Sequence, residues 1–165
     1  MEYLFPYDYE AKLLAEILKS NGLTQVLHNM PPGDWDAGER GIACLPDRVD
    51  VFREGVATAI GYAKILELGQ LHAMAGLAPE HGDPAELHQT YTSNLRFAAA
   101  ETEKAGIRLV IEMIKTRDIP GFYLSTSAKA EEILAEVASD NLYIQYDIYH
   151  MQIMEGQNAG VIIHH

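Results

Sequence analysis

The 165-residue sequence contains one cysteine, Cys44, and therefore cannot form a disulfide within a single chain. Nothing in the cysteine content indicates an oxidising compartment, so we expect a cytoplasmic protein. No apolar run is long enough to span a bilayer, and the opening residues MEYLFPYDYE lack the charged and apolar regions of a signal peptide. The sequence therefore predicts no membrane association.

Basic residues are also scarce. Twelve Lys and Arg stand against 24 Asp and Glu, and the formal net charge is −12. This balance opposes nucleic-acid binding, which needs a basic surface. A bound metal can still make one site locally positive, so the charge does not exclude an anionic small substrate. Length, the 48% hydrophobic share and the 22% charged share fit one globular domain over residues 1–165.

The sequence alternates strand-like and helix-like segments. Helical spacing of apolar residues, as in Leu13, Leu14, Ile17 and Leu18, indicates a helix that Asp8 could cap. The expected strands lie at residues 1–5, 23–29, 70–76, 107–114 and 142–147. Three helices are expected to start after Asp8, Asp47 and Asp83, and a fourth is expected over residues 128–139. Such alternation is typical of an α/β fold with parallel strands.

No G-x-G-x-x-G or P-loop motif follows any of these strands, and this absence disfavours a Rossmann-like sheet. We therefore expect a (β/α)8 TIM-barrel type of fold. Only about five parallel strands can be counted, whereas the complete barrel has eight and typically ~250 residues. The sequence predicts a partial barrel.

Each expected strand carries a polar side chain that could bind a metal: Glu2, His28, His72, Glu112 and Asp147. In a barrel the carboxyl ends of the strands converge on one mouth, where catalytic residues are found. Each of these residues also fits a purely structural role. Glu112 could form an ion pair, Asp147 could cap a helix, the histidines could be satisfied core residues, and Glu2 is most simply solvent-exposed.

The connection from Met30 to Pro46 is long and rich in Gly, Pro and Asp. Its length and composition fit a lid or binding loop better than a plain connection. We expect it to fold over the barrel mouth, with Trp35 and Arg40 near the site.

Five stretches carry a family resemblance: LFPYDYE, LHNMPPGDWDAGERGIACLP, MAG, RDIPGFYL and IQYDIYHMQIMEG. Together they closely resemble the hydroxypyruvate isomerases, a family of xylose isomerase-like TIM barrels. Oxo-tetronate isomerases and ketose 3-epimerases are neighbouring families. The resemblance implies an enzyme that interconverts hydroxypyruvate and tartronate semialdehyde through a metal-stabilised enediolate, and its substrate would be a small hydroxy-oxo acid.

The resemblance also implies roles for particular residues. Glu112 matches a glutamate that binds a divalent metal and exchanges a proton with the substrate, and Asp147 matches a second metal ligand. His150 stands where relatives hold substrate oxygens. We place four further residues in substrate binding: His28, His72, Trp35 and Arg40. Carboxylate ligands favour Mg²⁺ or Mn²⁺ over Zn²⁺.

The chain also departs from the family pattern. Its start matches the second strand of the family and its end follows the sixth, so the first strand and the last two βα units are expected to be missing. We expect little or no turnover from these residues alone. Where the family commonly has IEPIN, this chain has IEMIK, so Lys115 could pair with Glu112 and compete with the metal. Glu67 replaces a usual glycine.

Three functional alternatives remain open. One is a related oxo-tetronate isomerase or ketose 3-epimerase. Another is a DNA-repair nuclease like endonuclease IV, although its histidine ligands and basic DNA-binding surface fit this acidic chain poorly. The third is a non-catalytic remnant that binds a partner through open sheet edges. A homo-oligomer is compatible with each of them.

Overall fold

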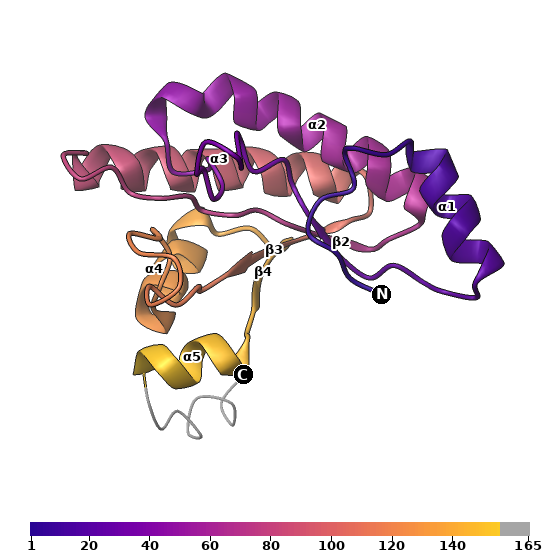
Figure 1. The fold of residues 1–165 in the computed structure, drawn as a ribbon. Coiled ribbons are helices and arrows are strands. Elements are labelled where there is room, and N and C mark those ends of the chain that lie inside the picture. The colour runs from indigo at the N-terminus through magenta and orange to yellow at the C-terminus, as the bar shows by residue number, and fades with distance from the viewer. Residues whose placement is uncertain (156–165) are drawn as a thin grey trace.

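The computed structural model describes residues 1–155, and within them four parallel strands form one sheet in the order β1-β2-β3-β4 (Figure 1). The strands are β1 (His28–Asn29), β2 (Gln70–His72), β3 (Arg108–Glu112) and β4 (Leu142–Gln145). The helices are α1 (Ala11–Ser20), the short 3-10 helix η1 (Pro46–Arg48), α2 (Val49–Leu66), α3 (Pro84–Lys104), α4 (Ser127–Val137) and α5 (Ile148–Glu155). The alternation confirms the predicted α/β partial TIM barrel. Among these helices none is long and apolar enough to cross a membrane.

The N-terminal edge of the sheet is less regular than the sequence predicts. Residues 1–5, expected as the first of five strands, form only an isolated parallel bridge between Glu2 and Leu27. The expected strand at 23–29 is regular only at its last two residues. The segments still run side by side, because the Asn29 N–H donates to the Leu4 carbonyl at 3.0 Å. An edge segment is held from one side only, so fewer backbone hydrogen bonds keep it regular.

Side-chain capping accounts for the start of α3 but not for the starts of α1 and α2. Asp83 accepts a hydrogen bond from the Ala85 N–H at 2.9 Å, and Pro84 occupies the first position of α3, as predicted. Asp8 does not cap α1: the helix begins at Ala11 after Glu10, whose side chain makes no capping hydrogen bond. Asp8 instead lies within a turn closed by the Tyr9 N–H on the Pro6 carbonyl.

The two faces of the sheet have different surroundings. On one face the cross-strand row of Leu71, Leu109 and Leu142 is buried in the main core. Figure 1 shows α2 and α3 lying across this side of the strands. Because side chains alternate along a strand, His72 and Glu112 point to the opposite face. That face carries the polar residues that the sequence singles out.

Glu67, at the end of α2, has a left-handed backbone with φ 56° and ψ 34°. Side chains with a Cβ are strained in this region and glycine is not. Glu67 is exposed, so little packing is lost when its side chain is removed. We expect Glu67→Gly to raise the free energy of unfolding by about 0.5–1 kcal/mol in urea denaturation.

The matched control is Lys64→Gly, an exposed position in the right-handed interior of the same helix. There glycine should lower the free energy of unfolding by about 1 kcal/mol. Equal destabilisation by both substitutions would contradict a strained backbone at Glu67.

Candidate active site

Glu112 is the last residue of β3 and lies beside Gln145, its partner in the parallel pairing with β4. The Gln145 amide donates a hydrogen bond to Glu112 Oε1 at 3.4 Å. Leu109, Val110 and Ile111, which precede Glu112, are buried, whereas Glu112 itself is half-buried. The apolar strand therefore presents one carboxylate at its carboxyl end, where it remains accessible to small molecules.

Asp147 lies two residues after the end of β4 and uses its two oxygens differently. Oδ1 accepts hydrogen bonds from the backbone N–H groups of Tyr149 at 2.7 Å and His150 at 3.4 Å, which caps α5. Oδ2 lies 3.8 Å from His150 Nε2. Asp147 therefore has the capping role that its position after a strand allowed, and it still offers an oxygen to the site.

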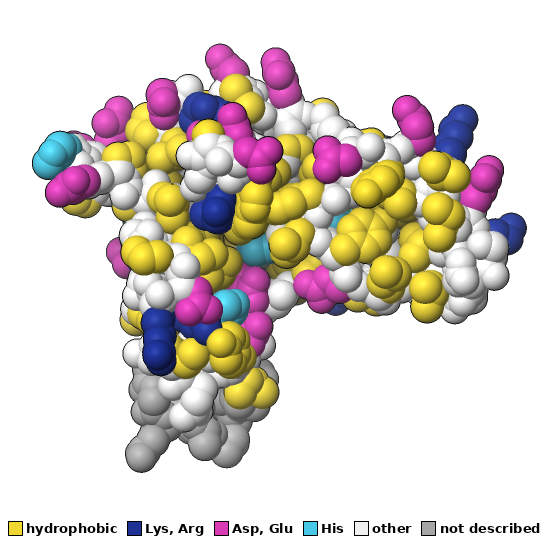
Figure 2. Space-filling model, in the orientation of Figure 1, with side chains coloured by type: hydrophobic (Ala, Val, Ile, Leu, Met, Phe, Trp, Pro, Cys, Tyr) yellow, Lys and Arg dark blue, Asp and Glu magenta, His cyan; other side chains and the backbone are white. Residues whose placement is uncertain are grey.

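Glu112, Asp147 and His150 form a compact group in which one possible ligand atom from each lies within 4.8 Å of the others. The expected closeness of the two carboxylates is thus confirmed. Figure 2 shows acidic and histidine side chains together in the hollow between the body of the molecule and α5. Two carboxylates and one imidazole fit a divalent cation, and all three residues are half-buried, so water or substrate can reach the position.

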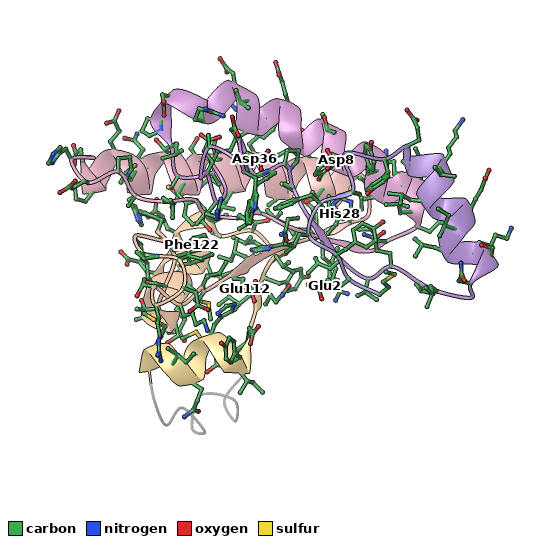
Figure 3. The ribbon with its side chains drawn as sticks, viewed as in Figure 1. Glu2, Asp8, His28, Asp36, Glu112 and Phe122 are labelled. Carbon is green, nitrogen blue, oxygen red and sulfur yellow. The ribbon has the colours of Figure 1, made fainter. Side chains whose placement is uncertain are left out.

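The surroundings of Glu112 disfavour its charged form. Burial is the largest cause, followed by the negative charges of Asp147 and Glu2, and together they raise the pKa of Glu112 to about 7. The hydrogen bond from Gln145 acts weakly in the opposite direction. Glu2 is exposed, as expected, and Figure 3 shows it on the same side of the strands as Glu112. A carboxyl group with this pKa can both accept and release a proton near neutral pH.

Lys115 does not pair with Glu112, contrary to the expectation from the sequence. Its ammonium lies 2.7 Å from Asp118 Oδ2 and 3.6 Å from the centre of the Tyr149 ring. Its side chain is only 2% exposed. Burial lowers the pKa of Lys115, but the hydrogen bonds and charges of Asp118 and Tyr149 outweigh it and raise the pKa. Lys115 is therefore charged and turned toward α5.

His72 lies on the same face of the sheet as Glu112, because its register partner Val110 precedes Glu112 by two residues. Its Nδ1 is 2.8 Å from Asn29 Oδ1, and its Nε2 is buried without a hydrogen-bond partner. Burial lowers the pKa of His72 to about 4, so the ring is neutral. A neutral imidazole with a free nitrogen suits the predicted contact with substrate oxygens, which stays a prediction.

His28 lies on the other face. It pairs in register with Leu71, whose side chain belongs to the helix-covered core. Its ring packs edge-on against Tyr7 at 5.7 Å, and Tyr7 in turn packs against Tyr62 of α2. Burial lowers the pKa of His28. The structure does not bring His28 into the group around Glu112; its Nε2 is buried without a hydrogen-bond partner, and its role in substrate binding stays a prediction.

The loop from Met30 to Pro46 is attached to the segment that follows β2. The Cys44 N–H donates to the Ala75 carbonyl at 2.8 Å, and Gly41 forms an antiparallel bridge with Ala75. Gly41 has φ +100°, and a Cβ there would lie 2.5 Å from Met74. Only glycine allows this close approach of the two chains, which holds the loop at the carboxyl end of the sheet.

Trp35 and Arg40 contact each other within this loop. The Arg40 guanidinium lies 4.0 Å from the centre of the Trp35 ring, and that ring packs against Phe5 at 5.0 Å. Arg40 also donates to the Trp35 carbonyl at 3.0 Å. The loop lies on the expected side of the sheet, while the predicted placement of both residues beside Glu112 stays a prediction.

Sequence reasoning missed three residues that shape the site. Gln145 forms a hydrogen bond with Glu112, and Asn29 forms one with His72. The ring of Tyr149 forms a cation–π contact with Lys115. For Gln145, its alternation with Asp147 along the strand expected at 142–147 was a usable signal. The other two depend on strand register and on the position of α5, which no local pattern contains.

Comparison with known proteins agrees with this architecture. The family model for the xylose isomerase-like TIM barrel matches residues 1–164. The chain belongs to this family. A solved structure described as an AP endonuclease of family 2 from Brucella melitensis superposes with a TM-score of 0.95 at 41% identity, covering 98% of this chain and 62% of that one.

Among curated proteins, the hydroxypyruvate isomerase of Escherichia coli K12 is 48% identical over 95% of this chain. The 2-oxo-tetronate isomerase of Cupriavidus necator is 45% identical over 96% of it. The chain spans 61% of the length of each of these relatives. These likenesses place the chain among isomerase homologues without separating the two reactions.

The raised pKa of Glu112 should appear in the pH dependence of stability. The folded protein binds the Glu112 proton more tightly than the unfolded chain, whose glutamate titrates near 4.5. The stabilisation is therefore complete below pH 4.5 and is lost as the pH rises through about 7. We expect it to contribute on the order of 2–3 kcal/mol in metal-free urea unfolding.

The contribution of Glu112 is the difference in the free energy of unfolding between the wild type and Glu112→Gln at each pH. The Glu112→Gln variant should lack this part of the pH dependence. Asp147→Asn removes one of the charges that raise the pKa of Glu112, so its pH dependence should lie between the two. Parallel stability curves for the wild type and Glu112→Gln would disprove the raised pKa.

Proposed function

We propose that this chain carries the proton-transfer site of an isomerase that interconverts hydroxypyruvate and tartronate semialdehyde. The observation that carries the proposal is the group of Glu112, Asp147 and His150, with ligand atoms within 4.8 Å of one another. The 48% identity with a hydroxypyruvate isomerase supports the choice of substrate.

The reaction moves one proton between neighbouring carbons and exchanges a ketone for an aldehyde. Glu112, as carboxylate, removes a proton from the hydroxymethyl carbon of hydroxypyruvate and then holds that proton as a neutral acid. Without a bound cation the pKa of Glu112 is about 7, and a cation bound at the site would lower it and favour the carboxylate that removes the proton. Returning the proton to the neighbouring carbon, while the oxygens exchange one proton, gives tartronate semialdehyde with all atoms balanced.

Glu112 and Asp147 would also hold a divalent cation, and the position of His150 makes it a third ligand candidate in addition to the substrate contact expected for it. The oxygen donors favour Mg²⁺ or Mn²⁺. When bound, the cation supplies Lewis-acid stabilisation of the negative charge that develops on the substrate oxygens. Asp147 contributes its Oδ2 while Oδ1 caps α5, and His150 is positioned by the first turn of the same helix. His72 would donate to or accept from a substrate oxygen through its free Nε2.

A 2-oxo-tetronate isomerase is the second candidate, because the identity with such an enzyme is 45%. Its substrate has the same hydroxy-oxo acid unit with one additional carbon, so the same residues can perform the same proton transfer.

The solved relative described as an AP endonuclease is less similar, at 41% identity. The net charge of −12 opposes DNA binding, and we propose no nucleic-acid substrate. A cytoplasmic location and a possible homo-oligomer stay predictions.

The proposed metal site is tested by isothermal titration with Mn²⁺ at pH 7.5. We expect one Mn²⁺ per chain for the wild type. Glu112→Gln should weaken binding by at least ~10-fold, since losing a direct ligand costs no less than losing an outer partner. Glu103→Gln makes the same chemical change at an exposed position on α3 and should leave affinity unchanged. Equal binding by all three proteins would disprove the site.

The proposed base is tested by hydrogen–deuterium exchange at the hydroxymethyl carbon of hydroxypyruvate. The exchange needs only one base, so it reports on Glu112 even where net isomerisation is slow. The protein is incubated with hydroxypyruvate and diamagnetic Mg²⁺ in D₂O, and the loss of the proton signal is followed by NMR. We expect Glu112→Gln to slow exchange by about 10²-fold or more.

Running 2-oxo-tetronate beside hydroxypyruvate compares the two candidate substrates in one experiment. Faster exchange of 2-oxo-tetronate would favour the second candidate. Exchange rates that are the same for the wild type, Glu112→Gln and buffer would remove the basis for an active isomerase site and favour a non-catalytic remnant.

A further inference from the structure

Lys115 is a buried cation that the proposed reaction does not use. Its side chain is 2% exposed, and a buried ammonium is costly unless its charge is satisfied. Asp118 provides a carboxylate at 2.7 Å, and the Tyr149 ring provides a negative π face at 3.6 Å. Asp118 comes from the same loop, whereas Tyr149 comes from α5, so the second contact joins two separate elements.

These two elements carry the two carboxylates of the site. Lys115 follows Glu112 by three residues, and Tyr149 follows Asp147 by two. The Lys115–Tyr149 contact therefore connects the loop after β3 with the first turn of α5. Within that turn, the Tyr149 N–H donates to Asp147 Oδ1 at 2.7 Å. A continuous series of contacts thus runs from the Lys115 ammonium to the Asp147 carboxylate.

The position of Tyr149 determines which way Asp147 points. When the Tyr149 N–H holds Oδ1, the other oxygen is left facing His150 Nε2 at 3.8 Å and lies in the group with Glu112. If the first turn of α5 shifted, Oδ1 would lose its partner and Oδ2 would turn with it. Residues that orient a ligand in this way strongly affect metal affinity without touching the metal.

We propose that Lys115 is a positioning residue of the Glu112–Asp147–His150 site, acting through Tyr149 to orient the free oxygen of Asp147. This inference rests on the proposed function, because it concerns the same metal site. It assigns Lys115 no contact with substrate. The charge of Lys115 is directed at Asp118 and Tyr149 rather than at Glu112.

An electrostatic role and a positioning role of Lys115 predict opposite changes in the affinity of the site for a cation. Removing a nearby positive charge should strengthen the binding of a cation if Lys115 acts only through its electrostatic field. Removing a positioning contact should weaken it. Tyr149→Leu deletes the π face and leaves every charge in place. Because Tyr149 is 60% exposed, the substitution removes little buried packing. Tyr149→Phe keeps the face and loses only the hydroxyl, which also interacts with Lys115, so it separates the ring contact from the hydrogen bond.

The experiment is the Mn²⁺ titration of the wild type, Tyr149→Leu, Tyr149→Phe and Lys115→Met at pH 7.5. We expect Tyr149→Leu to weaken Mn²⁺ binding by about 10-fold, in the range measured for residues that orient metal ligands. Tyr149→Phe should keep wild-type affinity. Lys115→Met should also weaken binding, by less than Tyr149→Leu, because the lost repulsion partly offsets the lost contact.

Met154→Ala is the matched control for general loosening of α5. Met154 makes a second contact of α5 with the same loop, since its Sδ accepts from the Thr116 N–H at 3.4 Å, and it lies at the far end of the helix. We expect it to lower the thermal midpoint, as Tyr149→Leu does, while Mn²⁺ affinity is unchanged. An equal loss of affinity in Met154→Ala would overturn the specific role of Lys115 and Tyr149.

Two further results would count against the proposal. Wild-type affinity in Tyr149→Leu, together with loss of binding in Glu112→Gln, would overturn this inference and leave the proposed metal site intact. Tighter binding in Lys115→Met with no change in Tyr149→Leu would show a purely electrostatic effect and overturn it as well. Absence of Mn²⁺ binding by the wild-type chain would overturn both the proposed site and this inference.

Discussion

Strand β3 pairs in parallel with β2 on one side and with β4 on the other, and the site is built on this pairing. In its register Glu112 is the partner of Gln145, and Val110 is the partner of both His72 and Tyr143. The carboxyl ends of parallel strands lie at the same edge of a sheet. The loop after β3 and the first turn of α5 therefore start next to each other, which is why residues 35 positions apart in the chain, Glu112 and Asp147, form one group.

Burial then gives this group its chemical character. An exposed cluster of acidic residues is screened by water and salt, whereas Glu112 is half-buried beside Asp147 and within the influence of Glu2. The accumulated negative charge is relieved either by a proton or by a cation. The same arrangement that suits Glu112 to carry a proton would also suit a divalent metal, so both proposed properties have one origin.

Features that depend on local pattern could be predicted from the sequence, and features that depend on register could not. The order of strands and helices, the cap at Asp83 and the closeness of Glu112 and Asp147 follow from spacing, from capping chemistry and from the convergence of parallel strands. His28 and His72 look equivalent in the sequence, yet one faces Tyr7 and α2 while the other shares a face with Glu112. One residue of register separates the two outcomes. Lys115 shows the same limit for side chains, because only the placement of α5 reveals the Tyr149 ring as its contact. The strand lengths at the N-terminal edge are shorter than predicted, since apolar composition does not report how many neighbours a segment has.

One oxygen of the Asp147 carboxylate caps α5 and the other faces His150 in the site. This links the start of α5 to the site in a way that can be observed without any ligand. Because the Tyr149 amide hydrogen is bonded to Oδ1, its exchange with solvent reports how often Asp147 leaves its place. The longer side chain of glutamate would place its two carboxylate oxygens farther from the backbone. With the same backbone, it could not both accept from the Tyr149 N–H and place its other oxygen in the group with Glu112 and His150. Helix fraying and loss of the site are therefore one opening event, visible at a single backbone amide.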